Sequence, residues 1–305
     1  MIPTGRQLSM RHCDFSAVVT ELGAGLRELT WRGRPLVVGF GPDELPIGYQ
    51  GAVLAPWPNR IADGRYTFAG QSQQLDLTEP DRLNSLHGLV IWEPWQVDAL
   101  EDASVRLTHR LWPHPGYPFV LDLEVGYRLG DNGLTFELTA TNAGDSAAPY
   151  GGSFHPYLVA GDGDVDSWTV QSPAASYLTV DPDRLLPQQV VPVSGGQHAF
   201  DVRQPSSLRG VEVDHAFTDI LFDDTGSAEL TLIDQGGQGV RMSWDRRCPW
   251  LQLCIPGPQR PAMHRKSLAV EPMTCPPDAF NSGVDLVVLQ PGQSHSLALT
   301  IGVVA

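Results

Sequence analysis

The stretch LDLEVGYRLGDNGLTFELTAT, residues 121–141, decides the fold class of this 305-residue chain. Apolar and polar residues alternate with a period of two from Leu121 to Leu129 and again from Leu134 to Thr141, which is the pattern of half-buried β-strands. Gly130-Asp131-Asn132-Gly133 separates the two runs and has the composition of a tight turn between antiparallel strands. The stretch therefore predicts a β-hairpin.

Two further features extend this prediction to the whole chain. The 31 glycines and 26 prolines interrupt nearly every window long enough for a helix, so we expect little helix. The same period-two alternation recurs in four other windows, which are residues 104–111, 228–233, 240–244 and 296–304. We expect an all-β protein, a single domain over residues 1–305 in which antiparallel sheets pack face to face as a sandwich.

Two long segments, residues 39–63 and 168–213, lack clean alternation. Their content of Pro, Gly and Asp predicts structured loops laid over a sheet rather than disorder, because Trp57, Trp168 and Tyr177 give them apolar anchors. Long loops on a rigid sandwich are a natural place for a ligand site.

Charge and composition exclude several classes of partner. The formal charge of −15 and the pI near 4.8 argue against a nucleic-acid or anionic-membrane partner, for which a basic patch would be expected. The four cysteines form no CxxC pair and have no histidine at zinc-finger spacing, so we predict no metal site. Residues 1–14 contain no continuous apolar run, so we expect neither a secretory signal nor a membrane anchor, and predict a cytoplasmic protein.

The segment AVEPMTCPPDAFN, residues 269–281, holds Glu271 among three prolines. Prolines fix φ and remove backbone donors, so we expect an ordered loop here that is neither a helix nor a central strand. Catalytic groups concentrate in such loops, which makes Glu271 a candidate general base. The alternative is a surface glutamate in a proline-rich loop.

Two histidines in short motifs are candidate proton donors. His155 lies in the run SFHPY, residues 153–157, and its alternative role is that of a satisfied structural histidine. His87 precedes Gly88, whose lack of a side chain would let the backbone approach a ligand closely. The alternative for His87 is a turn histidine with its ring in solvent.

Other polar and aromatic residues are candidate contacts for a ligand. Asn59 and Arg60 follow a Trp-Pro turn, and Arg60 could present several donors to hydroxyl groups or form a surface ion pair with Asp63. Asp214 has a carboxylate suited to accept hydrogen bonds from vicinal hydroxyls, but alone it is unremarkable, because neighbouring acids such as Asp219 show how easily an acidic residue here is just surface. Gln252 lies on an alternating strand, where its amide faces either the site or, in the alternative, the outer side of the strand. Trp92 and Trp57 could stack on an apolar face of a ligand, although most tryptophans of a β protein belong to its core.

These motifs, in this order, resemble the aldose 1-epimerase (galactose mutarotase-like) family, and the resemblance covers nearly the whole chain. It is most specific at Glu271, where a Glu-Pro pair, a later proline and Asp-Ala-Phe-Asn match the segment carrying the family's general base. By the same resemblance His155, in His-Pro-Tyr, protonates the ring oxygen, and His87, in His-Gly, binds near it. The family contacts its sugar through residues that correspond here to Asn59, Arg60, Asp214 and Gln252.

The resemblance implies a large twisted antiparallel β-sandwich with an open cleft on one sheet. It implies a cofactor-independent isomerase, a monomer or homodimer, that interconverts the α and β anomers of a free hexose or a related sugar. The run APWPNR, residues 55–60, looks like one bacterial subgroup, in which some members are expected to act on unusual sugars, including sulfonated ones. Residues 89–92, LVIW, replace a glycine-richer run of galactose-preferring members, which puts galactose itself in doubt.

Three alternatives remain open. A hexose-6-phosphate 1-epimerase would share the fold and chemistry but needs cations for the phosphate, for which residues 246–247 and 260–266 are the local clusters. A sulfonated hexose would need a cation in the same way. A non-enzymatic carbohydrate-binding module would not need both Glu271 and His155, so the joint presence of these two residues favours an enzyme.

Overall fold

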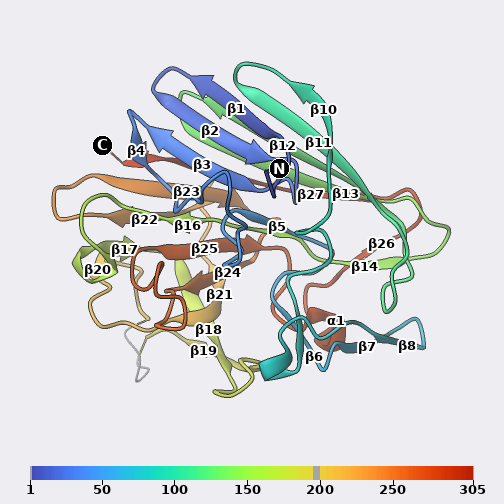
Figure 1. Cartoon of the computed structure of the whole chain (residues 1–305). Coiled ribbons are helices and arrows are strands. Elements are labelled where there is room, and N and C mark those ends of the chain that lie inside the picture. The colour runs from blue at the N-terminus through green and yellow to red at the C-terminus, as the bar shows by residue number, and fades with distance from the viewer. Residues whose placement is uncertain (1, 195–199, 305) are drawn as a thin grey trace.

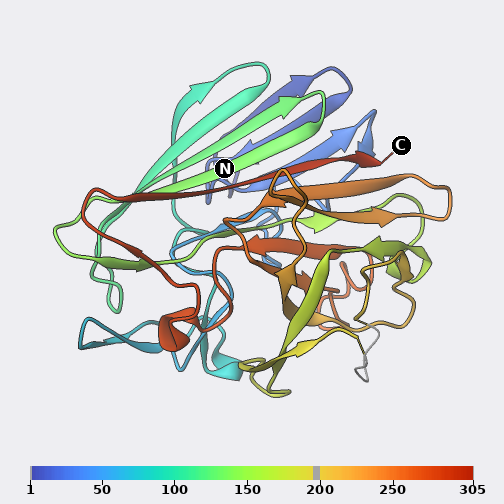
Figure 2. The same ribbon diagram turned by 180° about the vertical axis from the view of Figure 1, so that it is seen from behind.

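The computed structural model describes residues 2–194 and 200–304 of the chain. Its largest sheet is antiparallel and has nine strands in the order β10-β11-β12-β13-β27-β23-β22-β17-β20. Figure 2 shows β27 crossing the middle of this sheet, between β13 and β23. The strands are β10 (Gln96–Leu100), β11 (Ser104–Leu111), β12 (Leu121–Gly130), β13 (Gly133–Asn142), β17 (Thr169–Gln171), β20 (Ser206–Ser207), β22 (Ser227–Ile233), β23 (Gly239–Asp245) and β27 (Ser294–Val304).

A second sheet of eight strands lies beneath the first in the view of Figure 1, with the order β19-β18-β21-β24-β25-β15-β5 and β16 paired to β25. Its strands are β5 (Ala52–Leu54), β15 (Ser153–His155), β16 (Tyr157–Leu158), β18 (Ala174–Val180), β19 (Pro187–Pro192), β21 (Asp214–Ile220), β24 (Trp250–Cys254) and β25 (Leu268–Met273).

Smaller elements complete the fold. The four-stranded sheet β1-β2-β3-β4 lies toward the top of Figure 1, and the two-stranded pairs β7–β8 and β14–β26 lie toward its right side. Strands β6 and β9 form a third pair. These strands are β1 (Gln7–His12), β2 (Phe15–Thr20), β3 (Leu26–Trp31), β4 (Arg34–Pro35), β6 (Arg60–Ala62), β7 (Arg65–Phe68), β8 (Gln71–Gln74), β9 (Asn84–Leu86), β14 (Ala148–Tyr150) and β26 (Val287–Leu289). In the described ranges helix is confined to α1 (Ala279–Ser282) and two 3-10 turns, Pro80–Arg82 and Val165–Ser167.

The main core fills the space between the two large sheets. Alternate residues of the nine-stranded sheet, such as Leu123 and Leu138, belong to the same buried cluster as Leu251 and Val270 of the eight-stranded sheet. The Phe136 ring on β13 stacks on the Phe154 ring of β15 with their centroids 4.3 Å apart, which joins the sheets directly. The architecture is a sandwich of two antiparallel sheets.

The predicted hairpin at residues 121–141 is confirmed. Strands β12 and β13 pair in register from Leu121 with Asn142 to Gly130 with Gly133, so only Asp131 and Asn132 form the turn. Gly133 has a φ of 122°, and a Cβ atom there would lie 2.0 Å from the Ile301 carbonyl oxygen, so no larger residue fits. The other four windows also form strands, and the nearly all-β fold class is confirmed.

Two predictions about local structure were wrong. Neither of the two segments predicted as loops is a loop throughout, because β5 and β6 lie within residues 39–63, and β17, β18, β19 and β20 lie within residues 168–213. Residues 195–199 fall outside the described part. Glu271 does not lie in an irregular loop but in β25, an interior strand of the eight-stranded sheet. Pro272 is tolerated there because it faces the break between β15 and β16. Strand β16 pairs with β25 up to Ala269, and β15 pairs with β25 again only at Met273, so Pro272 lies where the ladder is interrupted.

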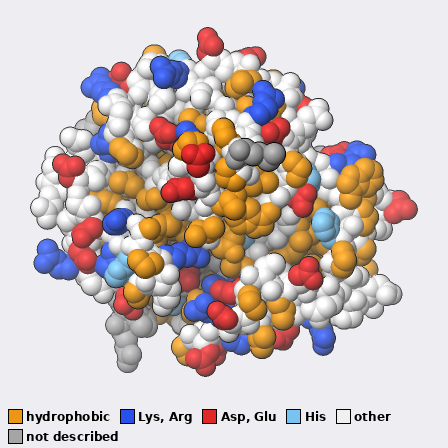
Figure 3. All heavy atoms as spheres, viewed as in Figure 1, with side chains coloured by type: hydrophobic (Ala, Val, Ile, Leu, Met, Phe, Trp, Pro, Cys, Tyr) orange, Lys and Arg blue, Asp and Glu red, His pale blue; other side chains and the backbone are white. Residues whose placement is uncertain are grey.

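The surface carries apolar side chains as well as side chains of both charges. Figure 3 shows apolar side chains gathered across the middle of one face, with cationic and anionic side chains beside one another below them. In the described part of the chain, no helix is long and apolar enough to cross a membrane. The four cysteines, at positions 13, 248, 254 and 275, are free thiols.

Candidate active site

The strands β24 and β25 present two different faces. Leu251, Leu253 and Val270 point into the main core, so the alternate residues Gln252 and Glu271 project from the opposite side of the sheet. A cleft of about 690 Å³ opens on this opposite side, which is a volume suited to a small ligand. Two hollows of similar volume lie elsewhere. One is lined by residues of β17 and β22 and by neighbouring loops, and the other mainly by residues of β10, β11, β12 and β13, so volume alone does not select a site.

Glu271 and His155 form a buried pair. The Nε2 atom of His155 lies 3.3 Å from Oε1 of Glu271, and their side chains are only 5% and 2% exposed. The other polar atom of each side chain, His155 Nδ1 and Glu271 Oε2, has no hydrogen-bond partner among the described residues. Buried polar atoms are seldom left unpaired in folded proteins, so such atoms mark a place where a ligand can supply the missing bonds.

His87 lies next to this pair. Its ring meets the His155 ring edge to face with centroids 5.2 Å apart, and meets the Tyr49 ring in the same manner at 4.8 Å. The backbone N–H of Asn59 donates to Nδ1 of His87 over 3.3 Å, which places the proton of a neutral ring on Nε2. His87 can therefore act as a donor through Nε2.

Arg60 is held beside the histidines by Glu79. Its Nε and Nη2 atoms donate to the two carboxylate oxygens of Glu79 over 2.8 and 3.0 Å, and its side chain is 9% exposed. Asn59 adopts a left-handed conformation with a φ of 55°, and its Oδ1 accepts from the backbone N–H of Arg60. This turn directs Asn59 and Arg60 to the site from the start of β6.

Asp214 and Gln252 connect the cleft with the buried pair. Gln252 Nε2 donates to Asp214 Oδ1 over 2.7 Å, and Asp214 Oδ2 lies 3.9 Å from Arg60 Nη2. Gln252 is also the cross-strand partner of Glu271, and its Oε1 lacks a partner among the described residues. Asp214 and Arg60 line the open cleft, whereas Gln252, Glu271 and His155 lie deeper.

Arg260 is a further cation of the cleft wall. Its Nη1 donates to the Tyr157 hydroxyl over 2.8 Å, and its guanidinium lies over the Tyr49 ring at 5.8 Å. Among the described residues no carboxylate lies within 4.0 Å of Arg260, unlike Arg60, which is paired with Glu79. Arg260 therefore carries an uncompensated charge near the site.

Burial controls the protonation of the three central groups. It raises the pKa of Glu271 well above the ordinary value, an effect that Asp214 reinforces and Arg60 and Arg260 oppose. Burial likewise lowers the pKa of His155 to about 3. The pKa of His87 is lowered by burial and by His155 beside it. The ligand-free pair thus favours one shared proton and no net charge, which suits two groups that exchange acid and base roles.

Several sequence predictions are not supported by the geometry. Trp57 is buried in the core against Tyr117 and Phe280, so it does not form a sugar platform. Gly88 brings the backbone close to the Ala55 carbonyl oxygen, 2.1 Å from where a Cβ would be, and not to a ligand. Trp92 is 47% exposed and is not among the residues lining the cleft.

The sequence interpretation also missed three residues of the site, Tyr49, Glu79 and Arg260. Tyr49 and Glu79 lie outside regular strands and belong to no motif, and only pairing with distant residues brings them to the site. Arg260 belongs to the segment 260–266, which the sequence indicated only as a cation cluster. The other predicted cation cluster, residues 246–247, lies away from the cleft, where β23 of the nine-stranded sheet ends and Arg247 pairs with Asp245.

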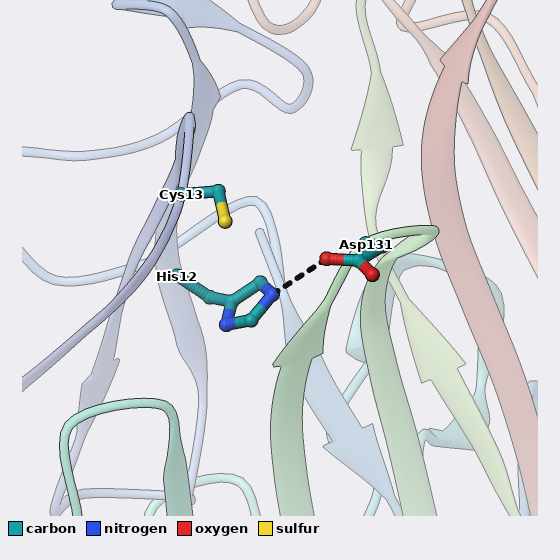
Figure 4. Close-up of side chains that lie close together, drawn as sticks. All are labelled: His12, Cys13 and Asp131. Atoms are coloured by element: carbon teal, nitrogen blue, oxygen red, sulfur yellow. Dashed lines mark hydrogen bonds and ion pairs between the residues drawn. The ribbon is translucent and has the colours of Figure 1, made fainter.

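One group of metal-ligating residue types lies outside the cleft, where β1 ends near the β12–β13 turn. His12 Nε2 is 2.8 Å from Asp131 Oδ1, with the Cys13 thiol beside them (Figure 4). The Asp131 side chain is 89% exposed, and the contact is a surface His–Asp pair. The prediction that the chain binds no metal stays a prediction.

Comparison with known proteins agrees with this fold. The family model described as aldose 1-epimerase matches residues 6–302. The chain is 37% identical over 299 residues to the uncharacterized protein YihR of Escherichia coli, covering 98% of this chain and 93% of YihR. It is 35% identical over 218 residues to the galactose mutarotase of Rattus norvegicus, covering 66% of this chain and 59% of that protein.

The fold is shared with a solved structure of a GalM/aldose epimerase homologue from C. elegans, at a TM-score of 0.84 and 21% identity, covering 98% of each chain. Sandwich and sequence together define a protein of the galactose mutarotase-like class. More specifically, the chain belongs to the aldose 1-epimerase family. This membership supports a sugar epimerase or mutarotase function of the isomerase type.

Proposed function

We propose that this protein is an aldose 1-epimerase that interconverts the α and β anomers of a free hexose or a related sugar, with Glu271 and His155 as its acid–base pair. The observation that carries the proposal is the contact of 3.3 Å between these two buried side chains, each with a polar atom left unpaired among the described residues. A carbohydrate-binding module would not need a buried carboxylate and imidazole in contact. The geometry therefore favours catalysis over binding alone.

The reaction needs one proton removed and one delivered. As a sugar binds, its hydroxyls supply donors to Glu271 Oε2 and Gln252 Oε1, and together with the cations Arg60 and Arg260 they favour the ionised form of Glu271. The proton that the pair shared then lies on His155, or on His87 beside it, as an imidazolium. This histidine protonates the ring oxygen while Glu271 takes the proton from the anomeric hydroxyl, and the ring opens. Rotation about the next carbon–carbon bond and reclosure, with the two groups reversed, gives the other anomer.

The remaining site residues bind the sugar in this proposal. Donors and acceptors for hydroxyl groups come from Arg60 at the start of β6 and Asn59 just before it, from Asp214 on β21 and from Gln252 on β24. In this proposal every group that the reaction needs comes from this chain, and the enzyme acts without a metal or organic cofactor. We propose in addition that it is a single-domain, cytoplasmic protein.

Arg260 favours a second candidate, an epimerase of an anionic hexose. It is a cation of the cleft wall with no carboxylate within 4.0 Å among the described residues, and such a group can bind a sulfonate or phosphate. Arg265 also lines the cleft but is paired with Asp166 over 2.6 Å. One free cation suits a single sulfonate better than a phosphate dianion, and the APWPNR subgroup is in keeping with this reading.

The test is direct measurement of anomer exchange at equilibrium by saturation-transfer NMR, across neutral, sulfonated and phosphorylated hexoses. We expect accelerated exchange for at least one of these sugars, lost in Glu271→Gln. Binding of a sugar without acceleration of exchange, in a panel that includes all three classes, would overturn the proposal in favour of a binding module.

A further inference from the structure

Glu79 is the residue that organises the open side of the site. Its carboxylate accepts two hydrogen bonds from the Arg60 fork, over 2.8 and 3.0 Å, and the Glu79 side chain is 15% exposed. Parallel two-point pairing of this kind fixes the plane of a guanidinium as well as its distance. A single hydrogen bond or a remote charge would leave the plane free.

The Glu79 carboxylate is itself anchored from the other side. Asn84 Nδ2 donates to its Oε2 over 2.9 Å, and Arg82 Nη1 lies 3.4 Å from its Oε1. Backbone hydrogen bonds in both directions join Glu79 to Asn84, which closes the loop that carries it. Burial alone would raise the pKa of Glu79, but the hydrogen bonds and charges from Arg60, Asn84 and Arg82 outweigh burial and lower it.

This loop is tied to the other wall of the cleft by Arg184, from the turn between β18 and β19. Its Nε donates to the Arg82 carbonyl oxygen and its Nη2 to the Leu83 carbonyl oxygen, both over 2.9 Å. Asn84 Nδ2 donates back to the Arg184 carbonyl oxygen over 3.0 Å. The support of Glu79 is thus built from two distant segments of the chain.

The position of Asp214 shows what Glu79 prevents. Asp214 Oδ2 lies 3.9 Å from Arg60 Nη2, which is too long for a hydrogen bond. A small movement of either side chain would bring the two atoms into hydrogen-bond distance. Two of the five donors of Arg60 are held by Glu79, so Arg60 and Asp214 stay separate and both can meet sugar hydroxyls. Without Glu79, the buried Arg60 would turn to Asp214 as its nearest carboxylate.

From these contacts we infer that Glu79 is a positioning residue for the reaction, which holds Arg60 apart from Asp214 so that both side chains remain available to the sugar. The inference rests on the proposed function. Glu79 acts through Arg60 and does not itself take part in proton transfer.

The test is a double-mutant cycle of Glu79→Gln and Arg60→Met, with anomer exchange measured on the best substrate. We expect Glu79→Gln to raise KM roughly tenfold or more while kcat changes little, because binding of the sugar is lost and the acid–base pair is not. We expect the double variant to have the same KM as Arg60→Met alone, since Glu79 acts through Arg60. Asp122→Asn is the matched control, because it breaks a bidentate pair between Asp122 and Arg110 on the nine-stranded sheet. This variant should leave KM unchanged.

The outcomes separate a positioning role from a structural one. An unchanged KM in folded Glu79→Gln, or losses that multiply in the double variant, would overturn the inference. Glu79→Asp keeps the charge but shortens the side chain, and we expect an intermediate KM; failure of both Glu79 variants to fold would assign Glu79 a structural role instead. If the wild-type protein exchanges no sugar, the proposed function fails, whereas normal wild-type exchange with an unaltered KM in Glu79→Gln overturns only this inference.

Discussion

Gln252 and Glu271 are cross-strand partners in the β24–β25 ladder, and each has one side-chain oxygen without a hydrogen-bond partner among the described residues. Leaving a buried acceptor unpaired costs about 1–3 kcal/mol, so two adjacent ones place a local cost on the fold. A sugar offers several hydroxyl donors on neighbouring carbons, which would satisfy both acceptors together. The same adjacency places the candidate base one strand away from a candidate binding group.

Glu271→Gln should abolish most of the activity while leaving sugar binding in place. The amide keeps the shape and hydrogen-bonding capacity of the side chain but cannot accept the anomeric proton, so we expect anomer exchange to fall by roughly 10²-fold or more. Saturation-transfer NMR measures the exchange, and ligand-observed NMR measures the binding. Glu137→Gln, an exposed position on β13, is the control; near-normal exchange by Glu271→Gln would refute the assignment.

The two histidines should differ in their effect on the rate. His155 contacts Glu271 directly, so His155→Asn should reduce kcat severely, by roughly 10²-fold or more. His87 touches His155 through ring packing and is tied to the Asn59 backbone, so His87→Asn should give a smaller loss if it only assists. His109→Asn, on β11 of the other large sheet, serves as the control. Equal losses in the two active-site variants would contradict this ranking.

Glu271→Gln should also make the protein more stable at neutral pH. Burial raises the pKa of Glu271 in the folded state, so its contribution to stability is present below the ordinary value of 4.5 and is lost as the pH rises through the folded-state pKa. Glutamine resembles the protonated acid and avoids this loss. Thermal unfolding should therefore show a higher Tm for the variant at neutral pH, with the difference shrinking as the pH falls towards 4.5 and absent below it. A lower Tm at neutral pH would contradict the burial argument.

The sequence predicted the strands better than it predicted the site. Residues 121–141 alternate because one side of each strand faces the core, and this local pattern is enough to predict β12 and β13. Glu271 was placed in a loop because Pro272 excludes a regular ladder on both sides, and only the pairing with β15 and β16 shows where the ladder is interrupted. Glu79 carries no local signal, since its role depends on Arg60, which lies nineteen positions away.

The last prediction concerns the charge of the substrate and depends on Arg260. If the substrate is a sulfonated hexose, Arg260→Gln should raise its KM roughly tenfold or more, because a charge-assisted contact is lost. KM of the wild-type enzyme should also rise with ionic strength, since the Debye length falls to about 10 Å at 0.1 M salt.

A neutral hexose provides the internal control for this prediction. Arg260 also donates to the Tyr157 hydroxyl, so a general disturbance of the site would raise KM for charged and neutral sugars alike. A selective effect on the anionic sugar would instead show that the Arg260 charge binds the anion. If KM for the best substrate is independent of salt and Arg260→Gln leaves it unchanged, the substrate is neutral, and Arg260 acts only in holding Tyr157 and Tyr49.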